Sequence, residues 1–241
     1  MAILSEPGKI LITGATHGIG KAAAELFCSR GWEVYGISGN GEDGRGAAME
    51  KTLPGFHYRV ADVSNEPEIS ALLGRIGQLD AAFNNAGTGI APQKLSEADI
   101  ARARPVIDVN LVGTLICMKH EIAHMPGSGV VVNNASLAAF KAATGADMSY
   151  SASKAGVLAL TAEAAANPEF AGRVSFFSIA PGYIETRMTA ADDKEAQKRR
   201  LPSRRLGQPA EVAALAYNII TNHYAFTSGQ CFNFDGGAFL I

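Results

Sequence analysis

The chain has 241 residues, of which 47% are apolar and 18% charged, a balance that suits a globular domain with an extensive core and excludes a disordered protein. Its formal net charge of -2 excludes the basic surface that nucleic acids and anionic membranes require. We therefore predict one domain spanning residues 1–241, with neither nucleic acid nor membrane as a partner.

The cysteines and the apolar runs indicate the cellular compartment in which we expect the protein. Cys28, Cys117 and Cys231 lie far apart and form no C-x-x-C pair, which predicts small core residues in a reducing compartment rather than disulfides or a metal site. Residues 10–12 are too short for a signal-peptide core. The longest uncharged stretch, residues 212–234, contains too many polar residues for a membrane span. We expect a cytoplasmic protein without a metal.

The first element is a short apolar run, residues 9–13, which predicts a strand. It leads into the glycine-containing turn Thr13-Gly14-Ala15-Thr16-His17-Gly18-Ile19-Gly20 and then into residues 21–29, whose apolar positions have helical spacing. A strand, a glycine turn and a helix in this order present backbone N–H groups and a positive helix end to a pyrophosphate. An ordinary tight turn is the alternative, but three glycines at this spacing favour dinucleotide binding.

Further short apolar runs alternate with helical stretches along the chain. The predicted strands after the first are residues 33–38, 56–60, 79–84, 130–134, 174–179 and 230–234. This alternation predicts an α/β fold, a doubly wound Rossmann-type parallel sheet of about seven strands with helices on both faces. Residues 96–99 can cap a helix that leads to Asn110, and Pro105 should bend or restart that helix.

Tyr150 and Lys154 lie four residues apart on a stretch that reads as the start of a helix, so their side chains share one face. A nearby ammonium favours the phenolate and lowers the tyrosine pKa, which suits a proton donor and acceptor. Alone, Y-x-x-x-K is weak evidence, because solvated helix faces carry it by chance.

The glycine spacing G-x-x-x-G-x-G resembles that of the short-chain dehydrogenase/reductase family, and other motifs from residue 9 to residue 237 extend the resemblance. They are Ala61-Asp62-Val63, Asn84-Asn85-Ala86-Gly87, Asp108-Val109-Asn110, Ser136, Tyr150 with Lys154, Pro181-Gly182-Tyr183-Ile184-Glu185-Thr186, and Asp235-Gly236-Gly237. The resemblance implies an NAD(P)-dependent oxidoreductase that transfers a hydride between a nicotinamide cofactor and a ketone or secondary alcohol.

Four catalytic roles follow from the resemblance. Tyr150 would be the general acid or base, and Lys154 would lower its pKa and bind the nicotinamide ribose. Ser136 would orient the substrate carbonyl, and Asn110 would hold a water that joins Lys154 to solvent. Carbonyl reduction needs such groups, because negative charge builds on the oxygen and a proton must reach it. Each residue also has a structural alternative: a strand-end cap, a turn residue or a surface charge.

The resemblance also implies the cofactor-binding residues. They are Gly14, Thr16, His17, Gly18, Ile19, Gly20, Ser38, Asp62, Val63, Asn85, Ala86, Gly87, Tyr150, Lys154, Pro181, Gly182, Ile184 and Thr186. Ser38 stands where family members that prefer NAD usually carry an acidic residue. Its neutrality favours NADP(H) and leaves NAD(H) open. His17 and Arg45 are candidate partners for a 2′-phosphate, which Glu42 and Asp43 would oppose.

The sequence says less about the substrate than about the cofactor. Ser136 and Tyr150 are fourteen positions apart where the family more often has thirteen, so the intervening loop carries an extra residue. Leu137, Phe140, Met148, Tyr183 and Met188 would line a mostly apolar pocket for a small carbonyl or alcohol substrate. A sugar, a steroid, a quinone and a ketoacyl thioester all remain open.

Two regions suggest partners. The charged segment 185–205 occupies the place of the family's substrate-covering loop; its basic residues suit an anionic substrate or carrier, although a solvated helix face is the commoner reading. Residues 156–166 form a smooth helix that we expect to pack against its twin in a homodimer or homotetramer. A nucleotide-sensing regulatory protein is the alternative function. The presence of all four predicted catalytic residues argues against it.

Overall fold

One parallel sheet organises the molecule. The computed structural model describes residues 7–39, 44–141, 146–190, 193–222 and 225–240. Within them, seven strands lie in the order β3-β2-β1-β4-β5-β6-β7. The strands are β1 (Lys9–Thr13), β2 (Glu33–Ser38), β3 (Phe56–Val60), β4 (Ala81–Asn84), β5 (Gly129–Asn134), β6 (Val174–Pro181) and β7 (Cys231–Phe234). The order confirms the predicted doubly wound fold, whose winding reverses between β1 and β4.

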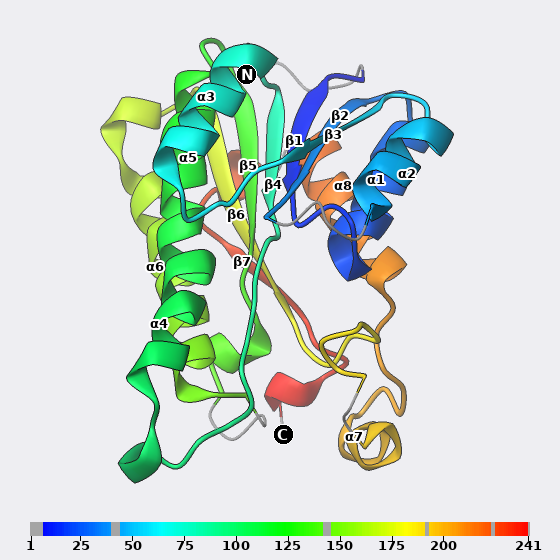
Figure 1. The fold of residues 1–241 in the computed structure, drawn as a ribbon, viewed down its shortest axis with the longest axis vertical. Coiled ribbons are helices and arrows are strands. Elements are labelled where there is room, and N and C mark those ends of the chain that lie inside the picture. The colour runs from blue at the N-terminus through cyan, green and yellow to red at the C-terminus, as the bar shows by residue number, and fades with distance from the viewer. Residues whose placement is uncertain (1–6, 40–43, 142–145, 191–192, 223–224, 241) are drawn as a thin grey trace.

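Helices cover both faces of the sheet (Figure 1). One face carries α3 (Glu66–Ile76), α4 (Ile100–Ile107), α5 (Gly113–Ala123) and α6 (Met148–Ala166). The other carries α1 (Gly18–Ser29) and α8 (Pro209–Thr221), with α2 (Arg45–Thr52) beside β3. The short α7 (Lys194–Arg200) lies away from the sheet, on the side of the carboxyl ends of its strands.

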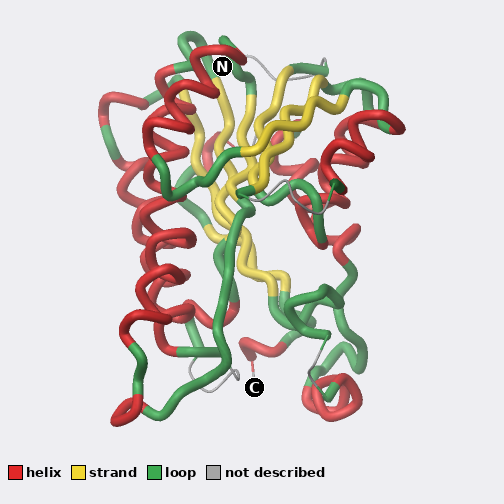
Figure 2. Tube along the Cα trace, in the orientation of Figure 1, coloured by secondary structure: helices red, strands yellow, loops and turns green. Residues whose placement is uncertain are grey.

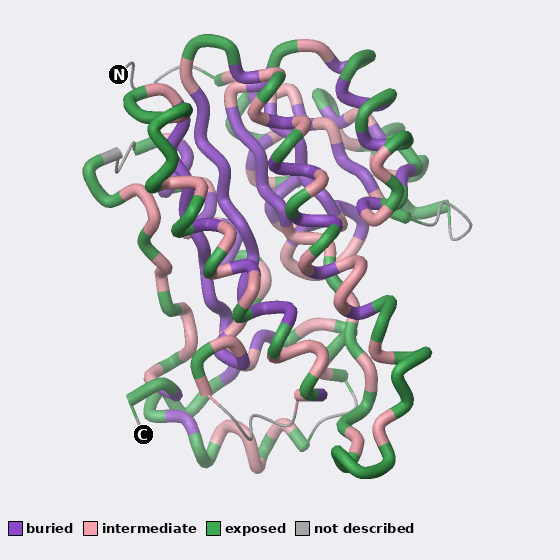
Figure 3. Tube along the Cα trace, turned by 90° about the vertical axis from the view of Figure 1, so that its left-hand side faces the viewer, coloured by how far each residue is buried: buried purple, intermediate pink, exposed green. Residues whose placement is uncertain are grey.

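The central strands are buried on both faces, which explains why they read as continuous apolar runs (Figure 3). Leu11 and Ile12 point to opposite sides, as neighbours in a strand must. Ile12 joins the core that contains Phe27 of α1, and Leu11 joins the core that contains Leu73 of α3. β1 is therefore covered by helices on each side.

The structure corrects some predicted boundaries. β4 begins at Ala81 rather than residue 79, because the Leu79 N–H donates to His124 O instead of joining the sheet. β6 extends to Pro181, which pairs with Phe234. The helix does not restart at Pro105: α4 contains it, and the chain continues through the π-helical turn η2 (Asp108–Val112) into α5.

The loops at the carboxyl ends of the strands gather at one end of the molecule, together with the C-terminal turn (Figure 2). Ligands bind at this end in open α/β sheets. Two sets of residues named in the predictions lie outside the described residues. One is Glu42 and Asp43, which we expect to repel a 2′-phosphate. The other is residues 142–145 of the loop before Tyr150. Among the helices of the described residues, none has the length and apolarity needed to cross a membrane.

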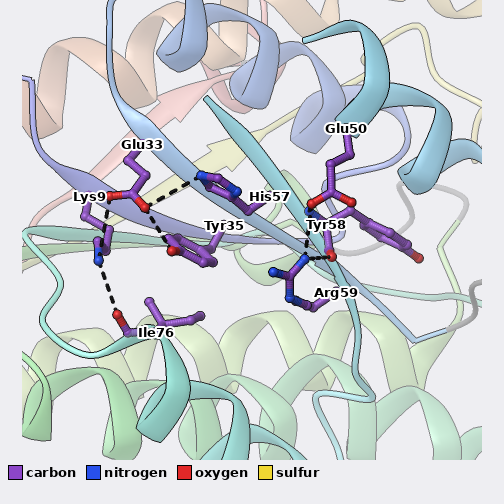
Figure 4. Close-up of polar contacts among 8 residues, drawn as sticks. All are labelled: Lys9, Glu33, Tyr35, Glu50, His57, Tyr58, Arg59 and Ile76. Carbon is purple, nitrogen blue, oxygen red and sulfur yellow. Dashed lines mark hydrogen bonds and ion pairs between the residues drawn. The ribbon is translucent and has the colours of Figure 1, made fainter. Parts of the chain in front are cut away.

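A side chain covers the outer edge of the sheet at β3. Glu50 of α2 accepts hydrogen bonds from the Tyr58 backbone N–H and from Arg59, both at 3.1 Å (Figure 4). In the same view, Glu33 accepts from the Tyr35 hydroxyl at 2.8 Å and lies 3.6 Å from Lys9 Nζ. Unpaired strand edges invite association with other chains, and the Glu50 bond occupies one of the edge N–H groups.

Candidate active site

The start of α1 presents uncommitted backbone N–H groups to the loop after β1. Its N-cap, His17, makes no side-chain cap hydrogen bond, and no acidic residue occupies the first turn, whereas Asp147 caps α6. Gly18 has a φ of 48°, a conformation that favours glycine. A Cβ at Gly20 would overlap the carbonyl of Gly14. This tight, uncapped loop fits the pyrophosphate of a dinucleotide.

The loop after β4 is bonded to the glycine loop. The backbone N–H groups of Asn85 and Ala86 both donate to Thr13 Oγ1, at 2.9 and 2.8 Å. The Asn85 side chain donates to Thr13 O at 3.1 Å and accepts from Asn134 at 2.9 Å. Asn85 therefore ties three strand ends together. Sequence reasoning missed Thr13, because a threonine at the end of a strand is ordinary.

The predicted ribose and adenine contacts lie at the ends of β2 and β3. The Ser38 hydroxyl is 2.6 Å from the Tyr58 hydroxyl, so a second polar group that the sequence did not indicate stands beside it. Asp62 accepts from the backbone N–H and the hydroxyl of Ser64, and Val63 is buried. These positions suit the predicted roles, which stay predictions.

The segment after β6 reaches back to the glycine loop. The Gly182 N–H donates to Phe234 O at 2.9 Å, and Ile184 is buried and pairs with Gly207. A Cβ at Gly18 would lie 3.3 Å from the Thr186 methyl group, so Thr186 stands over the start of α1. Of the predicted contact residues Pro181, Gly182, Ile184 and Thr186, the last thus lies beside the glycine loop.

Ser136, Tyr150 and Lys154 meet at the carboxyl end of β5. Ser136 Oγ accepts from the Ala138 N–H at 3.2 Å, and the Ser136 side chain lies close enough to Tyr150 to lower the pKa of its hydroxyl. Lys154 is buried; its Nζ donates to Asn134 O at 2.7 Å and lies 5.8 Å from the centre of the Tyr150 ring. The structure therefore brings the predicted proton donor, its serine partner and the lysine together.

Burial dominates the electrostatics of this group. It raises the pKa of Tyr150, and the hydrogen bond from Ser136 opposes that rise. It also lowers the pKa of Lys154 from 10.5 to about 8. The expected lowering of the Tyr150 pKa is therefore not the net direction in this structure, because removing the phenolate from water costs more than the hydrogen bond returns.

Asn110 lies in the π-helical turn η2 and is fully buried. Its Nδ2 donates to Thr88 O at 2.9 Å and Ser153 Oγ at 3.0 Å, while its Oδ1 accepts from the Thr88 N–H at 2.8 Å. A Cβ at Gly87 would lie 3.2 Å from Asn110 Oδ1 and 3.4 Å from Lys154 Nζ, so both atoms face the space beside Gly87. The second lone pair of Oδ1 is suited to the predicted water.

A buried polar cluster that the sequence did not indicate lies directly under this site. It consists of Asn84, Glu121, Asn133 and Thr161. Asn84 Nδ2 donates to Glu121 Oε2 at 2.9 Å and Asn133 Oδ1 at 3.0 Å, and Asn133 Nδ2 donates to Thr161 Oγ1 at 3.0 Å. Burial raises the pKa of Glu121 to about 8 against the hydrogen bond from Asn84. Glu121 is therefore a neutral acid at pH 7.

Only some of the residues predicted to line the substrate pocket are buried. Leu137 is buried and packs with Tyr183, whereas Phe140, Met148 and Met188 are exposed. A cavity of about 400 Å³ lies behind Tyr183, between Leu201 and Asp235. Within the described chain, its walls do not include Ser136 or Tyr150, so it is distinct from the catalytic group.

Three basic residues of segment 185–205 form ion pairs with acidic neighbours. Lys194 pairs with Glu185 at 2.5 Å and Lys198 with Glu195 at 2.7 Å. Arg205 pairs with Glu211 at 2.7 Å. These exposed pairs favour the solvated-face interpretation over an anion-binding one.

Comparison with known proteins identifies the relatives of this chain. Residues 14–238 match the profile of a family described as "Enoyl-(Acyl carrier protein) reductase". The chain is 35% identical to a cis-4-hydroxycyclohexanecarboxylate dehydrogenase of Sinomonas cyclohexanicum over 94% of each chain. It is 32% identical to a 2,5-dichloro-2,5-cyclohexadiene-1,4-diol dehydrogenase of Sphingobium indicum over 95% of each. A solved structure titled "ElxO with NADP Bound" is 26% identical, with a TM-score of 0.89 over 98% of this chain and 100% of that one.

Proposed function

The chain belongs to the short-chain dehydrogenase/reductase family, and we propose that it transfers a hydride between NADP(H) and a secondary alcohol or ketone on a six-membered carbon ring. It is an NAD(P)-linked oxidoreductase acting on alcohol and carbonyl groups, as its relatives are. The observation that carries the proposal is the proximity of Ser136, Tyr150 and the buried Lys154 at the carboxyl end of β5.

The ring substrate rests on two supports. The two dehydrogenase relatives are named for alcohols on six-membered carbon rings. Leu137, the residue after Ser136, belongs to an apolar cluster with Tyr183, Leu201, Leu206 and Ala238. A thioester on an acyl carrier is the second candidate, because the matching family profile is described by such a substrate.

The roles of the side chains follow from what carbonyl reduction demands. Tyr150 delivers a proton to the oxygen that becomes the alcohol, and Ser136 donates a hydrogen bond to the same oxygen. The Lys154 ammonium stabilises the phenolate that forms when Tyr150 gives up its proton. It also holds the nicotinamide ribose. Asn110 holds the water through which the proton is replaced. When bound, the nicotinamide supplies or accepts the hydride.

The preference for NADP(H) over NAD(H) rests on the end of β2. Ser38 and Tyr58 place two hydroxyl groups there, 2.6 Å apart. An acidic residue at this position would repel a 2′-phosphate. The related structure with NADP bound supports the same preference, with His17 and Arg45 as candidate phosphate partners.

We also propose a homodimer or homotetramer in the cytoplasm, built from a single domain over residues 1–241. Ala152, Ala155, Ala159 and Ala162 form an exposed stripe of small side chains along α6. Leu115 of α5 is 49% exposed. Sedimentation analysis of the purified protein tests this, and a monomer at micromolar concentration contradicts it.

Tyr150→Phe tests the proton-donor role. We expect turnover to fall by about 10² to 10⁴-fold, because the ring keeps its shape but has no proton to give. NADPH affinity, measured by fluorescence, should be retained. Tyr217→Phe on α8 is the matched control and should keep wild-type activity. Near wild-type turnover by the Tyr150 variant contradicts the role.

A substrate panel separates the candidates. Cyclohexanol and cis-4-hydroxycyclohexanecarboxylate are tested with NADP⁺, and acetoacetyl-CoA with NADPH, at the nicotinamide absorbance band. We expect kcat/KM for the ring alcohols to exceed that for the thioester by at least about tenfold. The reverse order favours the acyl-carrier candidate. Tight NADPH binding without turnover of any substrate favours the nucleotide-sensing alternative.

A further inference from the structure

The last described residues of the chain fold into a turn that contacts the segment after α7 on one side and the loop after Ser136 on the other. We define the C-terminal turn as residues 235–240, which include the 3₁₀-helix η6 (Ala238–Leu240). Asp235 organises it: its carboxylate accepts from the Gly237 N–H at 3.0 Å and from the Phe239 N–H at 2.7 Å. The turn therefore has a fixed shape of its own.

One side of the turn packs against the segment that follows α7. The Ser203 N–H donates to Gly236 O at 3.1 Å. A Cβ at Gly236 would lie 2.5 Å from Ser203 Oγ, and one at Gly237 would lie 2.9 Å from Pro202 Cγ. Both glycines have positive φ, so the turn and this segment fit together only with glycine at both positions.

The other side of the turn holds the loop that follows Ser136. Lys141 Nζ donates to Ala238 O at 3.0 Å, and the rings of Phe140 and Phe239 meet edge to face with centroids 5.6 Å apart. Ala238 is buried in the same apolar cluster as Leu137, the residue next to Ser136. Three contacts thus fix the loop from about one hundred residues away in the sequence.

This loop needs such a support. Ser136 Oγ is positioned by the Ala138 N–H, and the Phe140 and Lys141 N–H groups both donate to Leu137 O. The loop also carries one residue more between Ser136 and Tyr150 than the family usually has. Contacts made outside the loop must therefore hold Ser136 in register with Tyr150.

We propose that Phe239 is a positioning residue for the reaction: through Phe140 and Leu137 it fixes the Ser136 hydroxyl and sets the width of the substrate pocket. This inference rests on the proposed function of Ser136 and Tyr150. It predicts that substrate selection in this enzyme depends on its C-terminal turn.

Phe239→Ala tests the inference in two ways. Hydrogen exchange should accelerate by about tenfold in the peptide containing residues 137–141 and stay unchanged in α1. KM for the best ring substrate should rise by about fivefold, the effect of losing one aromatic ring pair, with NADPH affinity unchanged. Phe239→Tyr keeps the ring and should restore both readouts.

The matched control is Phe226→Ala, which removes an exposed aromatic side chain from another 3₁₀-helix, η5 (Ala225–Thr227). It should change neither readout. Phe140→Ala should reproduce the effect of Phe239→Ala, and the double variant should be no worse than either single one, because both remove the same contact.

The outcomes separate this inference from the proposed function. Unchanged exchange in residues 137–141 of the Phe239 variant overturns the inference, whatever the activity. A parallel loss of NADPH binding also overturns it, since the turn would then support the whole fold. If the wild type turns over no substrate, the proposed function fails, and the exchange experiment still decides whether the turn positions the loop.

Discussion

Replacing Glu121 by glutamine tests whether the buried carboxyl group of this residue is neutral. Burial raises the pKa of Glu121 from 4.5 to about 8, so the folded chain keeps a proton that the unfolded chain releases. The contribution of Glu121 to the free energy of unfolding therefore falls as the pH rises from about 4.5 to about 8, and stays level above that. At about 1.4 kcal/mol per pKa unit, the fall amounts to about 4 to 5 kcal/mol.

Glutamine keeps the shape of the side chain and cannot ionise, so Glu121→Gln removes this dependence. Urea unfolding at about pH 5.5, 7 and 8.5, at one protein concentration, gives the difference between variant and wild type. We expect that difference to shift in favour of the variant by about 3 kcal/mol over this range. Glu163→Gln, at an exposed position of α6, is the control.

The test lies in how the difference in unfolding free energy between variant and wild type changes with pH. The size of that difference at any one pH does not test the reasoning. Glu121 Oε1 has no hydrogen-bond partner, so an amide nitrogen placed there costs about 1–3 kcal/mol at every pH. A difference that stays constant from pH 5.5 to 8.5 refutes the reasoning, because Glu121 would then ionise alike in both states. Loss of cooperative unfolding in the variant would show that the cluster is needed for the fold.

Three further predictions concern the active site. The reduction rate should fall as the pH rises through about 8, because burial lowers the pKa of Lys154 to that value. Above it, the neutral amine no longer favours the phenolate form of Tyr150. A pH–rate profile that stays level to about pH 10 contradicts this prediction. Ser38→Asp should weaken NADPH binding by about tenfold or more and spare NADH, as fluorescence titration can measure; equal weakening of both contradicts the proposed preference. Gly20→Val should abolish binding of both nucleotides, since even a Cβ overlaps Gly14 O, and retained affinity in the same titration contradicts the placement of the loop.

Much of the fold could be predicted because its signals are local. The strands β1, β2 and β3 begin and end at the predicted residues, since buried parallel strands are continuous apolar runs bounded by turns. The end of β6 could not be placed, because Pro181 belongs to the strand only through its pairing with Phe234. The continuity of the helix through Pro105 likewise depends on surroundings that a local rule does not include.

The grouping of Ser136, Tyr150 and Lys154 was predictable for a different reason: Tyr150 and Lys154 are neighbours on one helix, and Ser136 follows the end of β5. Glu121 and Ala238 were not, because their roles come from contacts across 37 and 97 residues, with Asn84 and Lys141 respectively. A glutamate on a surface helix is usually exposed, so nothing in its own neighbourhood indicates burial. The direction of the Tyr150 pKa also depends on burial, which spacing alone does not give.

The hydrogen bond from Tyr58 to Glu50 has a consequence for how the protein behaves at high concentration. Another chain that extends the sheet at β3 must first displace a carboxylate that already bonds both the strand and Arg59. Without that carboxylate, the strand edge would offer a free N–H group to any extended segment of a neighbouring molecule. A single side chain of α2 thus makes fibrous, edge-to-edge aggregation at this border of the sheet less favourable, independently of catalysis.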